Sequence, residues 1–233
     1  PHLLSSSESL QQWDTNWDHL AESDTHGKAR SGKRIIVLIR HGQYDTSAVE
    51  DEDRKLTLLG REQAIITGKR LAKSLVHAGI PPERVTLWAS TMTRALETAD
   101  LVRDGLPADM AFHTDPLLRE GPPCVCTPPA AGWEPSPHSL WRDSLRIEAA
   151  FRSHFHRPAS DDDEHPKVDI LVCHGNVIRF FVLRALQLPP EAWLRMGVNH
   201  ASITTLYLSN SGTVSCRGLG DSGHLPVDKV TIQ

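Results

Sequence analysis

Apolar residues occur along this chain in two alternating patterns. Short apolar runs, each ending at polar residues, are typical of buried strands and occur at 34–39, 84–89 and 168–173. Between the first two runs, the apolar residues of 57–78 recur every three or four positions, which predicts an amphipathic helix ending before Gly79 and Pro81. Similar patterns predict further helices at 91–104, 138–156 and 176–187.

The remaining segments are shorter. A strand of a few residues is predicted at 109–113, before a loop rich in proline and glycine at 121–137. Two runs near the C-terminus, 202–208 and 213–219, are separated by turn residues and predict an antiparallel hairpin. The acidic stretch 160–166 is expected to be a solvated loop. Strands that alternate with helices in this order predict an α/β fold with a mostly parallel sheet.

Residues 1–33 are too few and too polar to fold alone, so one domain is expected over 34–233.

The N-terminal segment contains a motif that its polar surroundings do not explain. In WDTNWD, Trp13 and Trp17 are each followed by an aspartate, Asp14 and Asp18. The two rings lie on one side of the backbone whether it is helical or extended. Paired aromatic rings beside acids are typical of interface hot spots. They pack either against a second subunit or against their own domain, and periodicity does not decide between these alternatives.

Charge and hydropathy exclude two classes of partner. The 233 residues carry a net charge of −4, whereas a nucleic-acid-binding surface is normally basic, so no nucleic-acid partner is expected. No apolar run reaches about 18 residues, so no segment is expected to span a membrane. The chain begins at Pro1 without methionine, which predicts a fragment whose targeting or anchoring segment is missing.

The four cysteines do not have the spacing of a disulfide framework. Cys124 and Cys126 are too close for an unstrained bridge to each other, and Cys173 lies in an apolar run; the fourth is Cys216. A metal site is the alternative in a chain with 13 histidines, but no CxxC or HxxxH spacing supports one. Free thiols in a reducing compartment are therefore expected.

Polar residues follow three of the predicted strands where these strands end. Arg40 and His41 follow the first strand, Arg94 lies in the first turn of the helix after the second, and His174 follows the third. Ligands of open α/β sheets bind beyond the carboxyl ends of the strands, and helix N-termini favour anions. Two guanidinium groups and two imidazoles there predict a phosphoryl site. Each residue alone has a structural explanation, such as an Arg94–Glu97 ion pair. The placement of such residues at the ends of three strands at once has no comparable structural explanation.

On four motifs the sequence resembles the histidine phosphatase, or phosphoglycerate-mutase-like, family. The resemblance covers about residues 34–220, with the motifs in the family's order. They are LIRHGQYD (38–45), LTLLGREQA (56–64), WASTMTRALETA (88–99) and VCHGNVIR (172–179). The resemblance implies a single-domain, three-layer α/β/α sandwich around a mixed, mostly parallel sheet. It also implies catalysis without a metal or another cofactor.

The resemblance gives each of these residues a role. His41 matches the histidine that the family phosphorylates. It would attack phosphorus as a neutral ring whose other nitrogen donates a hydrogen bond. Arg40, Arg94 and a protonated His174 would stabilise the charge on the phosphoryl oxygens.

A serine or threonine leaving group also needs a proton donor. By position the family's acid falls in DPLLREG, where Glu120 is expected to serve and Asp115 is the alternative. Glu120 has a structural explanation as well, as a surface carboxylate paired with Arg119.

The substrate class depends on the segment after the first motif. Residues 43–55 carry five acids (Asp45, Glu50, Asp51, Glu52 and Asp53) and two bases (Arg54 and Lys55). This excess of negative charge would repel a small, multiply charged bisphosphoglycerate. The alternative is that residues 50–53 form a solvated loop that never faces the site.

WDTNWD and GDSGHLP, at 220–226, resemble a narrower group, the mitochondrial, mutase-like serine/threonine protein phosphatases. This resemblance implies phosphoproteins as substrates and a mitochondrial location with an N-terminal membrane anchor. It also implies a homo-oligomer larger than a dimer, assembled through Trp13, Asp14, Trp17 and Asp18. Two other functions stay open, a catalytically weak scaffold or adaptor and a small-molecule phosphatase. All the expected catalytic residue types are present, which favours the enzyme.

Overall fold

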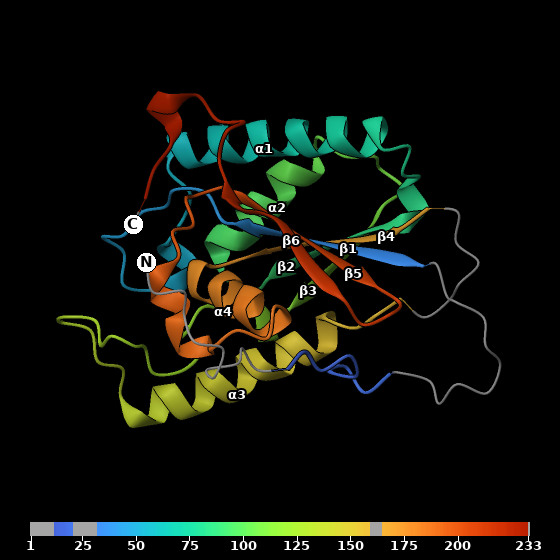
Figure 1. Ribbon diagram of the computed structural model, residues 1–233. Helices are drawn as coiled ribbons and strands as arrows, with labels where there is room; N and C mark the ends of the chain where they lie inside the picture. The colour runs from blue at the N-terminus through green and yellow to red at the C-terminus, as the bar shows by residue number, and fades with distance from the viewer. Residues whose placement is uncertain (1–11, 21–31, 159–164, 233) are drawn as a thin grey trace, which may run out of the picture.

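A six-stranded sheet with helices on both faces forms the centre of the computed structural model, which describes residues 12–20, 32–158 and 165–232 (Figure 1). Two expectations lie mainly outside these residues. They are the acidic loop at 160–166 and the polar segment at 1–33.

The sheet has the strand order β3-β2-β4-β1-β5-β6. Its strands are β1 (Lys33–Arg40), β2 (Val85–Ser90), β3 (Ala111–Asp115), β4 (Lys167–Cys173), β5 (Ile203–Ser209) and β6 (Val214–Asp221). Strands β3, β2, β4 and β1 are parallel, whereas β5 runs antiparallel to β1 and β6 runs antiparallel to β5. The predicted mixed, mostly parallel sheet is confirmed.

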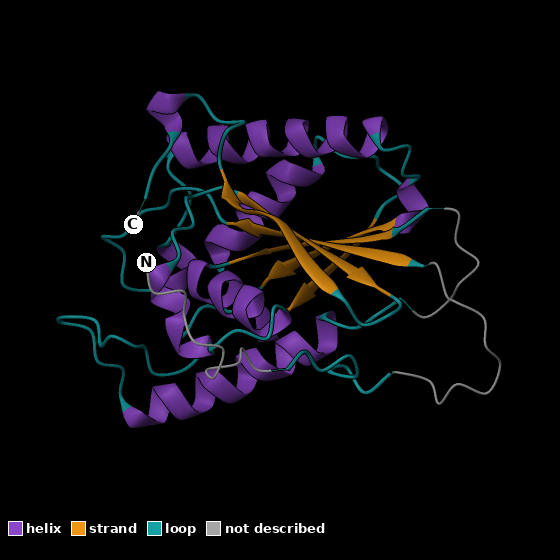
Figure 2. Ribbon diagram, in the orientation of Figure 1, coloured by secondary structure: helices purple, strands orange, loops and turns teal. Residues whose placement is uncertain are grey.

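Helices cover the sheet in two layers (Figure 2). They are α1 (Leu58–His77), α2 (Thr93–Arg103), α3 (Pro137–His154) and α4 (Gly175–Ala185). Strand β1 shows why its sequence is an unbroken apolar run. Ile36 and Leu38 pack in one core with α3 and α4, whereas Ile35, Val37 and Ile39 pack in another with α1 and α2. A strand buried on both faces has no polar side, so the three-layer α/β/α expectation is confirmed.

Every predicted strand and helix is present, with ends shifted by one or two residues. The pattern missed short 3-10 helices, among them η1 (Asp51–Asp53), η3 (Pro116–Leu118) and η4 (Pro190–Arg195). Helices of one or two turns bury too few residues to produce a periodic signal.

The turn after β1 is held against the start of α1. Thr57 caps this helix, because its side chain accepts a hydrogen bond from the Gly60 amide. A Cβ atom on Gly42 would lie 2.4 Å from the Gly60 carbonyl oxygen, so only glycine allows the two backbones to approach this closely. The close contact fixes the turn that presents His41.

Candidate active site

The ends of β1 and β4 place two histidines side by side. The strands pair in parallel with Arg40 opposite Cys173, so the next residues, His41 and His174, lie at the same edge of the sheet. Their ring centroids are 5.1 Å apart and both side chains are buried. The predicted convergence at the carboxyl ends of the strands is therefore present in the structure.

Two hydrogen bonds define the protonation state of His41. Its Nδ1 atom lies 2.8 Å from the Gly42 carbonyl oxygen, which only accepts, so Nδ1 carries the proton. Its Nε2 atom accepts from Nε of Arg94 at 3.2 Å. Burial, and then the positive charges around it, lower the pKa of His41 well below its usual value. The ring is thus neutral, with an unprotonated Nε2 facing a guanidinium group.

Arg40 supplies a buried cation beside this ring. Nη1 donates to the Val198 carbonyl at 2.7 Å, while the buried Nε has no hydrogen-bond partner among the described residues. Burial lowers the pKa of Arg40 to about 10, so the side chain is charged at neutral pH. A buried charged donor without a partner is costly, and an anion would satisfy it.

The His174 side chain is fully buried, and its charge differs from the expectation. Its Nε2 atom is 2.8 Å from Oγ of Ser90, and its buried Nδ1 has no partner in the described part of the chain. Burial, followed by the nearby guanidinium groups of Arg94, Arg146 and Arg40, lowers the pKa of His174 well below its usual value. A protonated His174 was expected, whereas burial and these cations favour the neutral ring, and sequence shows neither of them.

Glu120 faces the site from the loop after η3. Its carboxylate accepts hydrogen bonds from its neighbour, the Gly121 amide, at 3.0 Å and from the Asn176 amide at the start of α4 at 3.4 Å. Burial raises the pKa of Glu120, although these two amides and the nearby cations oppose the shift. Arg146 of α3 holds this turn through the Leu117, Arg119 and Glu120 carbonyl oxygens, at 2.6–3.1 Å.

Asp115, the alternative acid, is engaged elsewhere. One carboxylate oxygen accepts from the Leu117 amide at 2.8 Å, and the other lies 2.8 Å from Nε2 of His154. These contacts fix η3 and α3 relative to the sheet, so the geometry favours Glu120 over Asp115 as the proton donor.

Sequence reasoning missed His200 and Tyr44. The His200 ring centroid is 5.7 Å from that of His41, and the Tyr44 ring contacts His41 edge-on at 5.1 Å. Tyr44 also lies under the Arg94 guanidinium, 4.7 Å from its ring centroid. The position of His200 just before β5, which runs antiparallel to β1, could have indicated that this residue lies at the site. A strand antiparallel to β1 begins where β1 ends, so the residues just before β5 face the site.

The acidic loop contributes one residue to the site. Asp51 forms an ion pair with Arg94 at 3.2 Å, whereas the side chains of Glu50, Glu52 and Asp53 are exposed. Three of these acids are therefore solvated, as one alternative expects of the whole loop, whereas Asp51 contacts Arg94 at the site.

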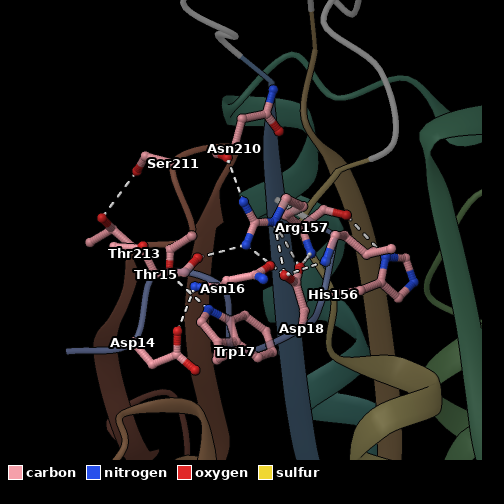
Figure 3. Close-up of polar contacts among 12 residues, drawn as sticks. Asp14, Thr15, Asn16, Trp17, Asp18, His156, Arg157, Asn210, Ser211 and Thr213 are labelled. Atoms are coloured by element: carbon pink, nitrogen blue, oxygen red, sulfur yellow. Dashed lines mark hydrogen bonds and ion pairs between the residues drawn. The ribbon is translucent and has the colours of Figure 1, made fainter. Parts of the chain in front are cut away.

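The second tryptophan of the WDTNWD motif docks on the domain of its own chain (Figure 3). Trp17 donates from Nε1 to the Gly212 carbonyl at 2.8 Å, and its ring centroid lies 6.1 Å from that of Phe151 on α3. Trp13 and Trp17 are both partly buried against the core beneath α3 and α4.

The aspartates of the motif bind the chain as well. Asp18 pairs with Arg157 at 2.6 Å, and both side chains are nearly inaccessible, with 1% and 8% exposed. The backbone of Asp14 exchanges two hydrogen bonds, each 2.8 Å long, with the side chain of Gln187. All four motif residues thus contact the domain of their own chain.

Three further expectations concern chemistry outside the site. All four cysteines lie within the described residues and are free thiols, as predicted. Among those residues, no three histidine, cysteine or acidic side chains are grouped so that they could hold a metal ion. A search of the same residues for a helix long and apolar enough to cross a bilayer also finds none.

Comparison with known proteins agrees with this geometry. The model of the histidine phosphatase superfamily (branch 1) matches residues 36–122 and 145–219. The chain is 43% identical over 239 aligned residues to the human mitochondrial serine/threonine-protein phosphatase PGAM5, covering 94% of this chain and 80% of the relative. The Drosophila willistoni mitochondrial protein of the same name is 44% identical over the same shares of the two chains.

Solved structures give the same fold. Phosphoglycerate mutase from Plasmodium falciparum is similar, with a TM-score of 0.57, 32% identity, and coverage of 87% of this chain and 99% of that one. A mycobacterial glucosyl-3-phosphoglycerate phosphatase has a TM-score of 0.58 at 22% identity, covering 82% of this chain and all of that one. At that identity the likeness concerns the fold alone.

Proposed function

The chain belongs to the histidine phosphatase superfamily, and from this membership we propose that it is a serine/threonine protein phosphatase acting through a phosphohistidine. The observation that carries the proposal is the state of His41. Its neutral ring keeps an unprotonated Nε2 between buried cations, as an in-line nucleophile requires.

The reaction has two displacements. In the first, the Nε2 lone pair of His41 forms a bond to phosphorus while the ester P–O bond breaks. The leaving alkoxide takes its electron pair and receives the proton of Glu120. In the second, water attacks the phosphohistidine, the P–N bond breaks, and the Glu120 carboxylate accepts the proton of water. His41 returns to its neutral form.

The pocket stabilises the charge that accumulates on the phosphoryl oxygens. Arg40 and Arg94 provide fixed positive charge, and the free Nε of Arg40 is a donor ready for an oxygen. His174 contributes as a neutral donor. If Nε2 accepts the Ser90 hydroxyl, the proton lies on Nδ1, the atom left without a partner. The step assigned to Glu120 is supported by its raised pKa and its place beside the start of α4.

A protein substrate is supported by the relatives that the chain resembles in sequence. Those at 43–44% identity are named serine/threonine protein phosphatases, whereas the phosphoglycerate mutase is 32% identical. A small-molecule phosphatase is the second candidate, because a protein that is 32% identical to this chain is named a phosphoglycerate mutase. A catalytically weak scaffold is less well supported, since every catalytic residue type is present at the site.

We also propose that WDTNWD joins subunits into an assembly larger than a dimer. A neighbour's segment would meet the same Phe151, Gly212 and Arg157 surface that the motif occupies in this chain. The polar residues between the motif and β1 provide reach toward a neighbour. Phe151 lies on α3 five residues after Arg146, which holds the Glu120 turn, so docking there would order the acid and raise activity.

A mitochondrial location with a membrane anchor on the full-length protein is the corresponding proposal for localisation. The names of the relatives support the mitochondrial location, whereas the anchor rests on the resemblance of WDTNWD and GDSGHLP to the mitochondrial phosphatases.

One experiment tests the function. Turnover of a panel of phosphoserine and phosphothreonine peptides is compared with turnover of 3-phosphoglycerate and 2,3-bisphosphoglycerate. We expect the peptides to have the higher kcat/KM. Faster hydrolysis of phosphoglycerates would favour the small-molecule phosphatase, and no turnover of either class would favour the scaffold.

A further inference from the structure

The carboxylate of Asp51 holds Arg94 from the side away from the nucleophile. Its Oδ1 atom accepts from Nη1 of Arg94 at 3.2 Å, while Nε of the same guanidinium donates to His41. The side chains of Arg94 and Asp51 are 4% and 29% exposed. Within the described residues, Asp51 is the one carboxylate that forms an ion pair with Arg94.

A second contact ties the same carboxylate to the backbone. Its Oδ2 atom accepts from the Thr93 amide, the first residue of α2, at 3.3 Å. The residue that precedes this helix, Met92, makes no side-chain capping bond. Asp51 therefore supplies an acceptor at the N-terminus of α2 from another element, and it holds both the helix start and the arginine that this helix carries.

The geometry of the guanidinium group indicates what this contact leaves free. Nε and Nη2 share one edge of the plane, the edge that binds two oxygens of a phosphate, whereas Nη1 lies at the far corner. Asp51 takes Nη1. On the shared edge, Nε contacts His41 and Nη2 lies 3.6 Å from the sulfur of Met92, a weak acceptor. Phosphoryl oxygens can therefore approach this edge without displacing the carboxylate.

We infer that Asp51 is a positioning residue for phosphoryl transfer, which fixes the Arg94 guanidinium with its Nε–Nη2 edge toward His41. The inference rests on the proposed phosphatase chemistry. Arginine is a long side chain that loses considerable rotamer freedom when it is held in one place. An ion pair at the far corner holds it before the substrate arrives, so that less ordering is needed in the transition state.

The competing interpretation is autoinhibition, in which Asp51 occupies Arg94 in place of the substrate phosphate and must leave. The two interpretations predict opposite signs. Loss of a positioning carboxylate weakens transition-state binding, whereas loss of a competitor strengthens phosphate binding and raises activity.

The test compares Asp51→Asn and Asp51→Ala with a matched control, Glu52→Gln. Glu52 belongs to the same 3-10 turn and carries the same charge, but its side chain is exposed. We expect Asp51→Ala to lower kcat/KM for p-nitrophenyl phosphate about tenfold or more, because small misplacements of catalytic groups have large effects on rate. Asp51→Asn keeps an oxygen for Nη1, and we expect a smaller loss. Glu52→Gln should stay within about twofold of the wild type, as a change in a screened surface charge does.

Two readouts separate positioning from a general structural effect. Inhibition by orthovanadate, which imitates the transition state, should weaken by a factor similar to the loss in kcat/KM, while binding of inorganic phosphate should change less. In an Arg94→Ala background, Asp51→Ala should cause no further loss, since the two residues act as one unit.

Three results would overturn the inference. They are higher activity or tighter phosphate binding in Asp51→Ala, unchanged activity and vanadate inhibition, and losses that add to those of Arg94→Ala. Thermal melts of each variant identify any that fail to fold, and Asp51→Asn is the nearly isosteric fallback. Phosphate and vanadate binding measured by calorimetry needs no turnover. A wild-type protein that binds both but hydrolyses nothing would contradict the proposed function without deciding the role of Asp51.

Discussion

Arg94 donates from Nε to Nε2 of His41 across 3.2 Å, so the lone pair of the proposed nucleophile already accepts a hydrogen bond from the cation that would stabilise the phosphoryl oxygens. The other nitrogen of His41 is fixed on the Gly42 carbonyl. This arrangement assigns the tautomer without a carboxylate partner. The ring stays neutral because burial, and then the positive charge around it, lowers the pKa of His41.

The first prediction concerns this nucleophile. We expect His41→Ala to lower kcat by at least about 10³-fold, because it removes the covalent route. Acid-labile, base-stable label from a phosphorylated substrate should be trapped on the wild type and absent from the variant. Replacement of His138, an exposed histidine on α3, by alanine is the control and should leave labelling unchanged. A fully active His41→Ala protein would contradict the whole enzymatic proposal.

The second prediction concerns the proton donor. We expect Glu120→Gln to slow phosphoserine and phosphothreonine esters by about 10²–10⁴-fold, the range typical of general acid catalysis. Hydrolysis of p-nitrophenyl phosphate should fall far less, because its leaving group hardly needs a proton. Asp115→Asn is the comparison, and its effect should appear in thermal stability rather than in the ratio of the two substrates. Equal losses on both substrates would place the acid elsewhere.

A third prediction follows from the raised pKa of Glu120. The first displacement needs this carboxyl protonated, so kcat/KM for a phosphoserine peptide should fall as pH rises through the folded pKa of Glu120, which burial raises above its usual value. The pKa of His41 lies well below its usual value, so His41 stays neutral over this range and adds no pH dependence of its own to kcat/KM. The pH profile of wild type and Glu120→Gln is the measurement. An identical fall of kcat/KM with rising pH in the variant would assign this pH dependence to another group.

The strand-end residues of the site were predictable from sequence because each depends on local structure. Arg40, His41, Arg94 and His174 follow strands or open helices, and parallel pairing then brings these positions to one edge. The charge of His174 was not predictable, because it depends on burial and on guanidinium groups distant in sequence.

The contacts of the acidic loop illustrate the same limit. Asp51 and Arg94 are 43 residues apart, and nothing in the loop's composition distinguishes Asp51 from its three exposed neighbours. The 3-10 turn that begins at Asp51 is too short to produce a periodic pattern in the sequence. His200 was missed for a different reason, because only the ends of the parallel strands were considered and the start of an antiparallel strand lies at the same edge.

A fourth prediction concerns substrate selection by the exposed acids. We expect lysine at Glu50, Glu52 and Asp53, with Asp51 retained, to raise kcat/KM for 2,3-bisphosphoglycerate several-fold at low ionic strength. The gain should shrink at high salt, since exposed charges are screened over about 10 Å at 0.1 M. The control places the same three charge reversals at Glu83, Asp104 and Asp109, which are exposed near the opposite end of the sheet. An equal gain in kcat/KM in the loop variant and the control variant would show that the effect comes from net charge and not from the position of the loop.

The fifth prediction concerns whether the WDTNWD motif binds the domain of a neighbouring subunit or the domain of its own chain. Light scattering should give the wild type a mass larger than a dimer, and Trp13→Ala/Trp17→Ala a mass of dimers or monomers with reduced turnover. Each lost ring is expected to cost about 2 kcal/mol or more at an interface. Trp141→Ala removes a tryptophan that is 64% exposed on α3, and this control should keep the wild-type mass.

A mixing experiment separates docking between subunits from docking within one chain. Arg157→Ala removes the partner of Asp18 on the receiving surface but leaves the motif intact, whereas the double tryptophan variant leaves the receiving surface intact. If the motif docks on a neighbour, an equimolar mixture should recover part of the larger mass and of the turnover, because intact motifs meet intact surfaces on other subunits. If it docks on its own chain, every chain in the mixture carries one defect and nothing is recovered. A double variant that keeps the wild-type mass would show that the tryptophans stabilise only their own chain, as the contacts to Phe151 and Gly212 within it allow.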